Sequence, residues 1–135
     1  MRFFITNFKW VMLVSGLLTC TMLQAFISPD ASLLSNFGQT LDGHLSEMIV
    51  RNWGALIGLM GIMLIYGAFK EQVRRFVLVI AGSSKLIFIL LVLSSDESYM
   101  NFGAGTAVIV DSLMIILFAL YILLNVTRRA SKYEN

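Results

Sequence analysis

The chain has 135 residues, of which 58% are hydrophobic and 13% charged, and its mean hydropathy of +0.82 lies outside the range of soluble domains. The net charge of +2 does not indicate nucleic-acid binding, because the basic residues lie at the ends of apolar stretches and form no patch. We therefore expect an all-α integral membrane protein, with residues 1–135 in a single domain: a four-transmembrane-helix bundle in contact with the lipid bilayer.

The first predicted span covers about residues 10–27 and follows a short segment that carries Arg2 and Lys9 but no acid. A basic start before an apolar run is also typical of a secretory signal peptide. The run is long for a signal peptide, however, and residues 24–29 contain no clear cleavage site of small residues, which favours a retained span.

Residues 28–47 form the one sizeable loop of the chain. Pro29 after Ser28 is typical of a first helical turn and Gly38 of a helix end, so we expect a short helix of about two turns. The sequence leaves open whether this segment lies on the membrane surface or docks against a partner.

The second predicted span, about residues 48–69, carries glycines on one face. Gly54, Gly58 and Gly61 recur at helical spacing, and glycines four residues apart let two membrane helices approach closely. Arg51 lies on the same face. A charged residue there favours packing inside the bundle over a dimer interface, although both remain open.

The third predicted span covers about residues 76–94 and contains Lys85 near its middle. Ala81 and Gly82 lie one turn away on the face of Lys85. Small residues on that face indicate that it packs against protein, not lipid.

The fourth predicted span covers about residues 103–126 and contains Asp111. Lys85 and Asp111 both lie roughly 12–14 Å below the outer ends of their spans, given the helix rise of about 1.5 Å per residue. A charged side chain at the bilayer centre costs roughly 2.5–3.5 kcal/mol and usually faces a partner in the bundle. Because a tight turn joins the two spans, we expect them to be antiparallel neighbours and Lys85 to pair with Asp111.

The charges on the connecting segments predict the orientation. Lys and Arg gather at the amino end, in the turn over residues 70–75 and in the tail, whereas acids dominate residues 28–47 and 95–98. The positive-inside rule then places both termini in the cytoplasm.

Polar residues in the outer halves of the spans indicate a ligand site that opens outward and is closed toward the cytoplasm. The residues of this predicted site are Lys85, Asp111, Arg51, Asn52, Thr19 and Thr21. Two simpler interpretations remain open. The Lys85–Asp111 pair would only fix how the helices pack, and Arg51 would only pair with Glu47 one turn back.

The sequence contains none of the common hydrolase or phosphate-binding motifs, and no pair of histidines in the spans to bind haem. His44 stands alone in a loop and Cys20 is the only cysteine, which predicts neither a metal site nor a disulfide. We therefore expect no catalytic residue, no metal and no evident cofactor.

Several of these features together resemble one protein family. They are the Pro and Gly in the first outer loop, a lysine inside the third span, and the run Arg51-Asn-Trp-Gly54-Ala-Leu-Ile-Gly58-Leu-Met-Gly61. This pattern is similar to the small bacterial four-helix membrane proteins of the DoxX-like group, and most to its uncharacterised stand-alone branch. The resemblance implies the bacterial cytoplasmic (inner) membrane. It also implies thiol or sulfur oxidation through a membrane quinone, or an accessory role beside a larger complex, although the lack of a second cysteine puts dithiol chemistry in doubt.

These observations give three functional hypotheses. The first is a non-enzymatic accessory subunit of a larger membrane complex, or a binder of a small or lipidic ligand, with a membrane-protein partner or a second copy of the chain. The second is a quinone-linked membrane oxidoreductase with the quinone near Lys85 and Arg51. The third is a small proton-coupled transporter in which Lys85 and Asp111 exchange protons, although four spans without a repeat are few for alternating access.

Overall fold

The computed structural model describes residues 2–95 and 97–133, with side chains over residues 4–95 and 97–126. Within these residues the regular structure is entirely helical. The elements are α1 (Arg2–Cys20), α2 (Leu23–Ile27), α3 (Pro29–Phe37), α4 (His44–Phe69), α5 (Glu71–Ser94), the 3-10 helix η1 (Glu97–Asn101) and α6 (Gly103–Tyr133). Within the described part of the chain, four segments are long and apolar enough to cross a membrane: Phe4–Ile27, His44–Phe69, Glu71–Ser94 and Gly103–Val126.

The first apolar segment bends instead of forming one straight helix, and its helical structure begins at Arg2, earlier than the sequence predicts. Thr21 and Met22 separate α1 from α2, and their amides donate to carbonyls three residues back over 3.2 Å each. The hydroxyls of Thr19 and Thr21 also donate to carbonyls of α1, those of Ser15 and Leu18. Such bonds compete with the helical pattern and often bend a helix.

The helix α3 lies in the loop for which the sequence predicts a short helix. It begins at Pro29, a residue that suits the first helical turn because it has no amide to satisfy. It ends at Gly38, whose left-handed backbone (φ 68°) favours glycine and whose amide donates to the Leu34 carbonyl over 3.0 Å. Pro29 and Ser32 form the buried face of α3.

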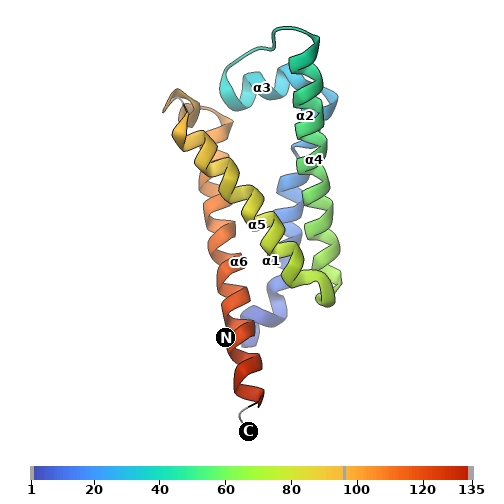
Figure 1. Ribbon diagram of the computed structural model, residues 1–135, viewed down its shortest axis with the longest axis vertical. Coiled ribbons are helices and arrows are strands. Elements are labelled where there is room, and N and C mark those ends of the chain that lie inside the picture. Colours follow the sequence, from blue (N-terminus) through green and yellow to red (C-terminus); the bar gives the residue numbers. More distant parts are fainter. Residues whose placement is uncertain (1, 96, 134–135) are drawn as a thin grey trace.

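The long helices form two pairs that meet near the termini and diverge toward α3 (Figure 1). The segments α1 and α2 pack along α4, and α5 packs along α6. Both termini and the α4–α5 turn lie at the lower end of Figure 1, and α3 lies at the upper end.

An apolar core joins the two pairs at the end that holds the termini. In this core Phe8 of α1 stacks on Tyr121 of α6 with ring centroids 4.0 Å apart. The largest fully buried apolar side chains are Phe8, Phe118, Met12, Leu64 and Leu78. They come from all four long helices, so this end of the molecule is closed by packed side chains.

The glycine face of α4 lies against α1 and α2 inside the molecule. A Cβ atom added at Gly54 would lie 2.7 Å from the Phe26 amide nitrogen, and one added at Gly61 would lie 2.7 Å from the Gly16 carbonyl oxygen. Backbone atoms this close leave no room for a side chain at either position. The glycines of α4 therefore serve helix packing within the chain.

The two small residues near Lys85 differ in their surroundings. Ala81 is buried in the core, as the sequence predicts. Gly82 is not a position of close helix packing, because the nearest atom to an added Cβ would be 3.9 Å away on Phe118. Consecutive residues point about 100° apart on a helix, so only one of the two faces the core.

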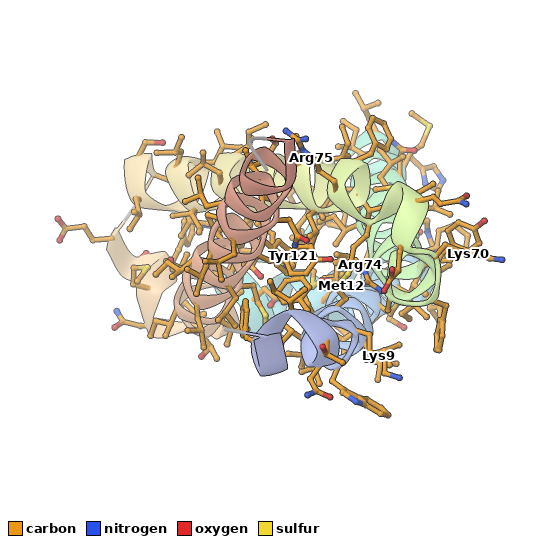
Figure 2. The ribbon with its side chains drawn as sticks, turned by 90° about the horizontal axis from the view of Figure 1, so that it is seen from below. Lys9, Met12, Lys70, Arg74, Arg75 and Tyr121 are labelled. Atoms are coloured by element: carbon orange, nitrogen blue, oxygen red, sulfur yellow. The ribbon has the colours of Figure 1, made fainter. Side chains whose placement is uncertain are left out.

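Arg74 closes the turn between α4 and α5. Its buried guanidinium donates from Nε to the Gly67 carbonyl over 3.1 Å and from Nη2 to the Ala68 carbonyl over 2.8 Å. These are carbonyls that the end of α4 leaves without helical partners. Nη1 also donates to the Tyr121 hydroxyl over 3.3 Å, and the two side chains point toward each other in Figure 2.

Candidate functional site

A cavity of about 280 Å³ lies between the two helix pairs, in the half of the molecule nearer α3. Most of its wall is apolar. Leu64 and Met114 belong both to this wall and to the core, so the core closes the cavity toward the termini. The divergence of the helix pairs thus creates the cavity, and the core forms its boundary on the side of the termini.

One side of the cavity carries its two charged side chains and the Thr19 hydroxyl. Lys85 of α5 forms an ion pair with Asp111 of α6, and its ammonium group also donates to the Thr19 hydroxyl of α1 over 3.2 Å. The Thr19 hydroxyl donates in turn to the Ser15 carbonyl over 2.8 Å. The structure therefore brings together the two charged residues that the sequence predicts to pair, and it links three helices through them.

Packing between α5 and α6 places Lys85 and Asp111 at the same height along the two helices. Ile89 lies one turn beyond Lys85 on α5, and Val108 lies one turn before Asp111 on α6. These two apolar residues belong to one buried cluster, which holds the antiparallel helices in register. The short turn through η1 makes the two helices neighbours.

Lys85 and Asp111 are both withdrawn from the surface, with 10% and 17% of their side chains exposed. A buried charge without a counter-charge is costly, whereas a close pair largely offsets its own charges. Among the described residues that line the cavity, these two are the only ones with a charged side chain. The cavity wall therefore carries its charges at one place and has no net charge as a whole.

Ser15 supplies a further polar group to this wall. It is 1% exposed, it lines the cavity, and its hydroxyl has no hydrogen-bond partner among the described residues. Buried hydroxyls are normally paired, so this one stands out.

Aromatic side chains line the part of the cavity nearer α3. Phe37 of α3 lies 6.2 Å from the Trp53 ring of α4 and 5.5 Å from the Tyr99 ring of η1, measured between ring centroids. Phe37 and Trp53 both line the cavity, together with Phe88 of α5. These contacts hold α3 across the diverging helix pairs.

Arg51 and Asn52 do not reach the cavity, although the sequence predicts them in the same site as Lys85. Arg51 donates to the Glu47 carboxylate from Nε over 3.0 Å and from Nη2 over 2.8 Å. Its Nη1 donates to the carbonyls of Phe26 and Ile27 at the end of α2. The simpler interpretation of Arg51, a pair with Glu47, is therefore present in the structure, and Asn52 is exposed on the surface.

The two threonines of the predicted site have different positions. Thr19 is buried against Lys85. Thr21 lines the edge of the cavity but is exposed, and its hydroxyl donates to the Leu18 carbonyl over 2.6 Å. The part of the predicted site that converges is thus Lys85, Asp111 and Thr19, with Thr21 at the rim.

The described residues contain no group of three His, Cys, Asp or Glu side chains that could hold a metal ion. The thiol of Cys20 lies 3.7 Å from the Gly58 carbonyl oxygen, where α1 packs on α4. Its position is that of a small residue in a helix contact.

Several cavity residues were not predicted from the sequence. Ser15, Phe37, Trp53 and Phe88 lie on helix faces that periodicity alone assigns to packing or to an interface. The available signal is the spacing of Ser15 and Thr19, which are four residues apart and therefore share a face of α1. Nothing in the sequence indicates that α3 would bring Phe37 over the same space.

No protein-family model, curated protein or solved structure matches the chain. The DoxX-like resemblance therefore stays a prediction. Any functional proposal depends on the geometry of the cavity and on the distribution of apolar and charged residues.

Proposed function

We propose that the chain is a multi-pass membrane protein that binds a small amphipathic ligand in the cavity beside Lys85. The observation that carries this proposal is the cavity itself. Its wall is mostly apolar, and Lys85, Asp111 and Thr19 meet at one place in it. Sites for small molecules typically have this composition, with apolar walls for affinity and a few polar groups for orientation.

The outer surface of the four long helices supports insertion into a membrane. Leu17, Ile62, Leu90 and Ile109, one from each, are all more than half exposed, with values of 61%, 51%, 58% and 70%. Soluble monomers rarely expose continuous apolar surface of this kind. Lipid tails would cover it without loss of hydrogen bonds, because the backbone groups are paired within the helices.

The charge distribution supports an orientation with both termini in the cytoplasm. Lys9, Lys70 and Arg75 point outward around the end of the molecule that holds the termini (Figure 2). The opposite end carries the exposed acids Asp30 and Glu97. By the positive-inside rule the basic end faces the cytoplasm, so the cavity lies in the outer half of the membrane. The DoxX-like resemblance adds the bacterial inner membrane as the proposed location.

The cavity is closed toward the end of the molecule that holds the termini, which favours ligand binding over transport. Packed side chains of Phe8, Met12 and Phe118 lie between the cavity and the end that holds the termini. A proton path from Lys85 and Asp111 to that end would have to cross this core. The paired charges therefore support a ligand site better than a continuous route for protons.

The same cavity supports a quinone-linked oxidoreductase as a second candidate. Trp53 and Phe88 supply aromatic surface to the cavity wall against which a quinone ring would stack, and the Lys85 ammonium would donate to a quinone carbonyl. This candidate rests on the DoxX-like resemblance for its redox role.

Native mass spectrometry of the protein extracted gently from its own membrane tests the proposal. We expect a reproducible small adduct on the wild type. Ala107→Phe should remove the adduct, because Ala107 lines the cavity. Ile109→Phe is the matched control, since Ile109 is on the same helix but 70% exposed on the outer surface, and it should keep the adduct.

Two results would count against ligand binding in the cavity. One is a wild-type protein without any adduct, and the other is an adduct that persists equally in Ala107→Phe. Co-release of a larger polypeptide would support the accessory-subunit hypothesis in its place. An adduct with the mass and absorbance of a quinone would favour the second candidate.

A further inference from the structure

Resting on the proposed function, we propose that the ligand is a neutral amphiphile. Its head group is a hydroxyl or carbonyl that bonds to Ser15 and Lys85, and it enters sideways between α1 and α6. The three observations behind this are the charge balance of the cavity, the hydroxyl of Ser15, and the position of the exposed lining residues.

The charge balance of the cavity disfavours a charged head group. Lys85 and Asp111 pair with each other, and no other lining residue among those described is charged. An anionic head group beside Lys85 would have to compete with the Asp111 carboxylate, and a cationic one beside Asp111 would have to compete with the Lys85 ammonium. Either charge would also lose its hydration on entering the apolar wall, with no free counter-charge to offset that loss.

The Ser15 hydroxyl provides a specific contact for a neutral head group. Serine and threonine in the helices of this chain commonly bond back to a carbonyl one turn earlier. Thr19 donates to the Ser15 carbonyl over 2.8 Å, and Ser112 donates to the Val108 carbonyl over 2.7 Å. Ser15 has no such bond among the described residues, although it is 1% exposed. Ser15 is one of the residues that line the cavity, and a serine hydroxyl can both donate and accept.

The exposed lining residues show where a ligand enters. Leu18 of α1, Thr21 just after α1 and Thr106 of α6 line the cavity and are also exposed on the outside of the molecule. The two helices are close near the termini and apart at the α3 end (Figure 1). Because the three residues are exposed and also line the cavity, we infer that the cavity opens between these helices. Val14 and Leu113, further along the same helix faces, are 50% and 55% exposed.

The opening therefore faces an apolar surface. A ligand with an apolar tail can keep that tail against this surface, among lipid chains, while its head group lies beside Ser15 and Lys85. The paired charges of the cavity and its apolar opening together favour a ligand with a neutral head group and an apolar tail, such as a long-chain alcohol.

Tryptophan fluorescence of Trp53 provides the test, since Trp53 lines the cavity and the other tryptophan, Trp10, does not. In Trp10→Phe, the emission of Trp53 is followed during titration with 1-decanol, decanoate or decyltrimethylammonium at pH 8. These probes share a ten-carbon chain and differ in head-group charge. The reference variant is Trp53→Phe, which keeps only Trp10 and reports general partition into the detergent micelle.

We expect 1-decanol to change the Trp53 emission saturably and the two charged probes to give only the unsaturable change of the reference variant. Adding Ser15→Ala should weaken the apparent affinity for 1-decanol about three- to tenfold, the effect of one lost hydrogen bond. Ser112→Ala is the matched control, because the Ser112 hydroxyl is already paired within α6, and it should leave the affinity unchanged.

The possible failures have different meanings. Saturable binding of decanoate or decyltrimethylammonium that equals or exceeds that of 1-decanol would overturn the neutral head group and leave ligand binding in place. Unchanged 1-decanol affinity in Ser15→Ala would overturn the role of that hydroxyl. If none of the three probes binds saturably and Ala107→Phe gives the same titrations, both this inference and the proposed function fail.

Discussion

Removing one partner of the Lys85–Asp111 pair should destabilise the protein more than removing both. Lys85→Met keeps an unbranched side chain, so the packing of the stem is largely retained. The variant loses the hydrogen bond to Thr19, worth about 1 kcal/mol. It also leaves the Asp111 carboxylate, whose side chain is 17% exposed, without a counter-charge, which costs about 2 kcal/mol more. The expected loss of about 3 kcal/mol is at the lower end for a broken buried pair.

The double variant Lys85→Met with Asp111→Asn has no unpaired charge and should lose only about 1 kcal/mol, the value of the bond to Thr19. Asp111→Asn alone leaves the Lys85 ammonium, whose side chain is 10% exposed, without a counter-charge and should also cost about 2 kcal/mol. The loss in the double variant is then about 4 kcal/mol smaller than the two single losses together, and this difference is the coupling energy between the two positions. The measurement is the free energy of unfolding in mixed detergent micelles for the wild type, both single variants and the double variant. Equal free energies for Lys85→Met and the wild type would refute the pairing, and so would losses that simply add in the double variant.

Three further comparisons test the packing, the turn and the cavity wall. Gly61→Ala should lower the free energy of unfolding by about 1–3 kcal/mol because its methyl group meets the α1 backbone. Gly82→Ala has space and should raise the free energy of unfolding by up to about 1 kcal/mol; thermal unfolding of the two variants in detergent checks the order. Arg74→Lys should cost about 2 kcal/mol, because lysine lacks the fork that reaches two carbonyls of α4. Arg75→Lys, at an exposed position, should change stability by less than about 0.5 kcal/mol, and equal losses in these two denaturation curves would contradict the role of Arg74. Ser15→Ala should leave the stability of the ligand-free protein unchanged or raise it by up to about 1 kcal/mol, because it removes a buried hydroxyl that has no partner among the described residues; a clear drop in its melting temperature would show that this hydroxyl is paired.

The features that could be predicted from the sequence are those set by strong local preferences. Charged residues inside apolar stretches are costly enough that Lys85 and Asp111 have few alternatives to pairing with each other. The glycine spacing of α4 similarly indicates a close helix contact, and Gly54 and Gly61 make that contact with α1 and α2. In both cases the chemistry of one residue type, a charge in an apolar helix or a missing side chain, leaves few possible arrangements of the helices.

Arg51 is a residue for which the sequence left two interpretations open, a ligand site beside Lys85 and a pair with Glu47. Its position on the glycine face of α4 indicates that it points toward neighbouring helices. In the structure it binds Glu47 and the carbonyls of Phe26 and Ile27. Those carbonyls are available because α2 ends there, after a bend that depends on how threonine hydroxyls compete with the helical pattern. Hydrophobic periodicity carries no information about such a bend.

The aromatic part of the cavity was missed for a different reason. Phe37 lies on the short helix α3, and its contacts with Trp53 and Tyr99 join segments that are far apart in sequence. Contacts of this kind depend on where the diverging helix pairs leave space. A periodic pattern can identify an apolar face, but it does not identify the neighbour of that face.

The turn closed by Arg74 bears on the order in which the fold assembles. Its guanidinium reaches carbonyls only seven and six residues earlier, those of Gly67 and Ala68. Contacts between residues this close in sequence form with little loss of chain entropy. The helices α4 and α5 can therefore associate as a hairpin while α1 and α6 are still apart. Tyr121 then docks on an arginine that the hairpin already holds in place, so the last helix finds a prepared surface.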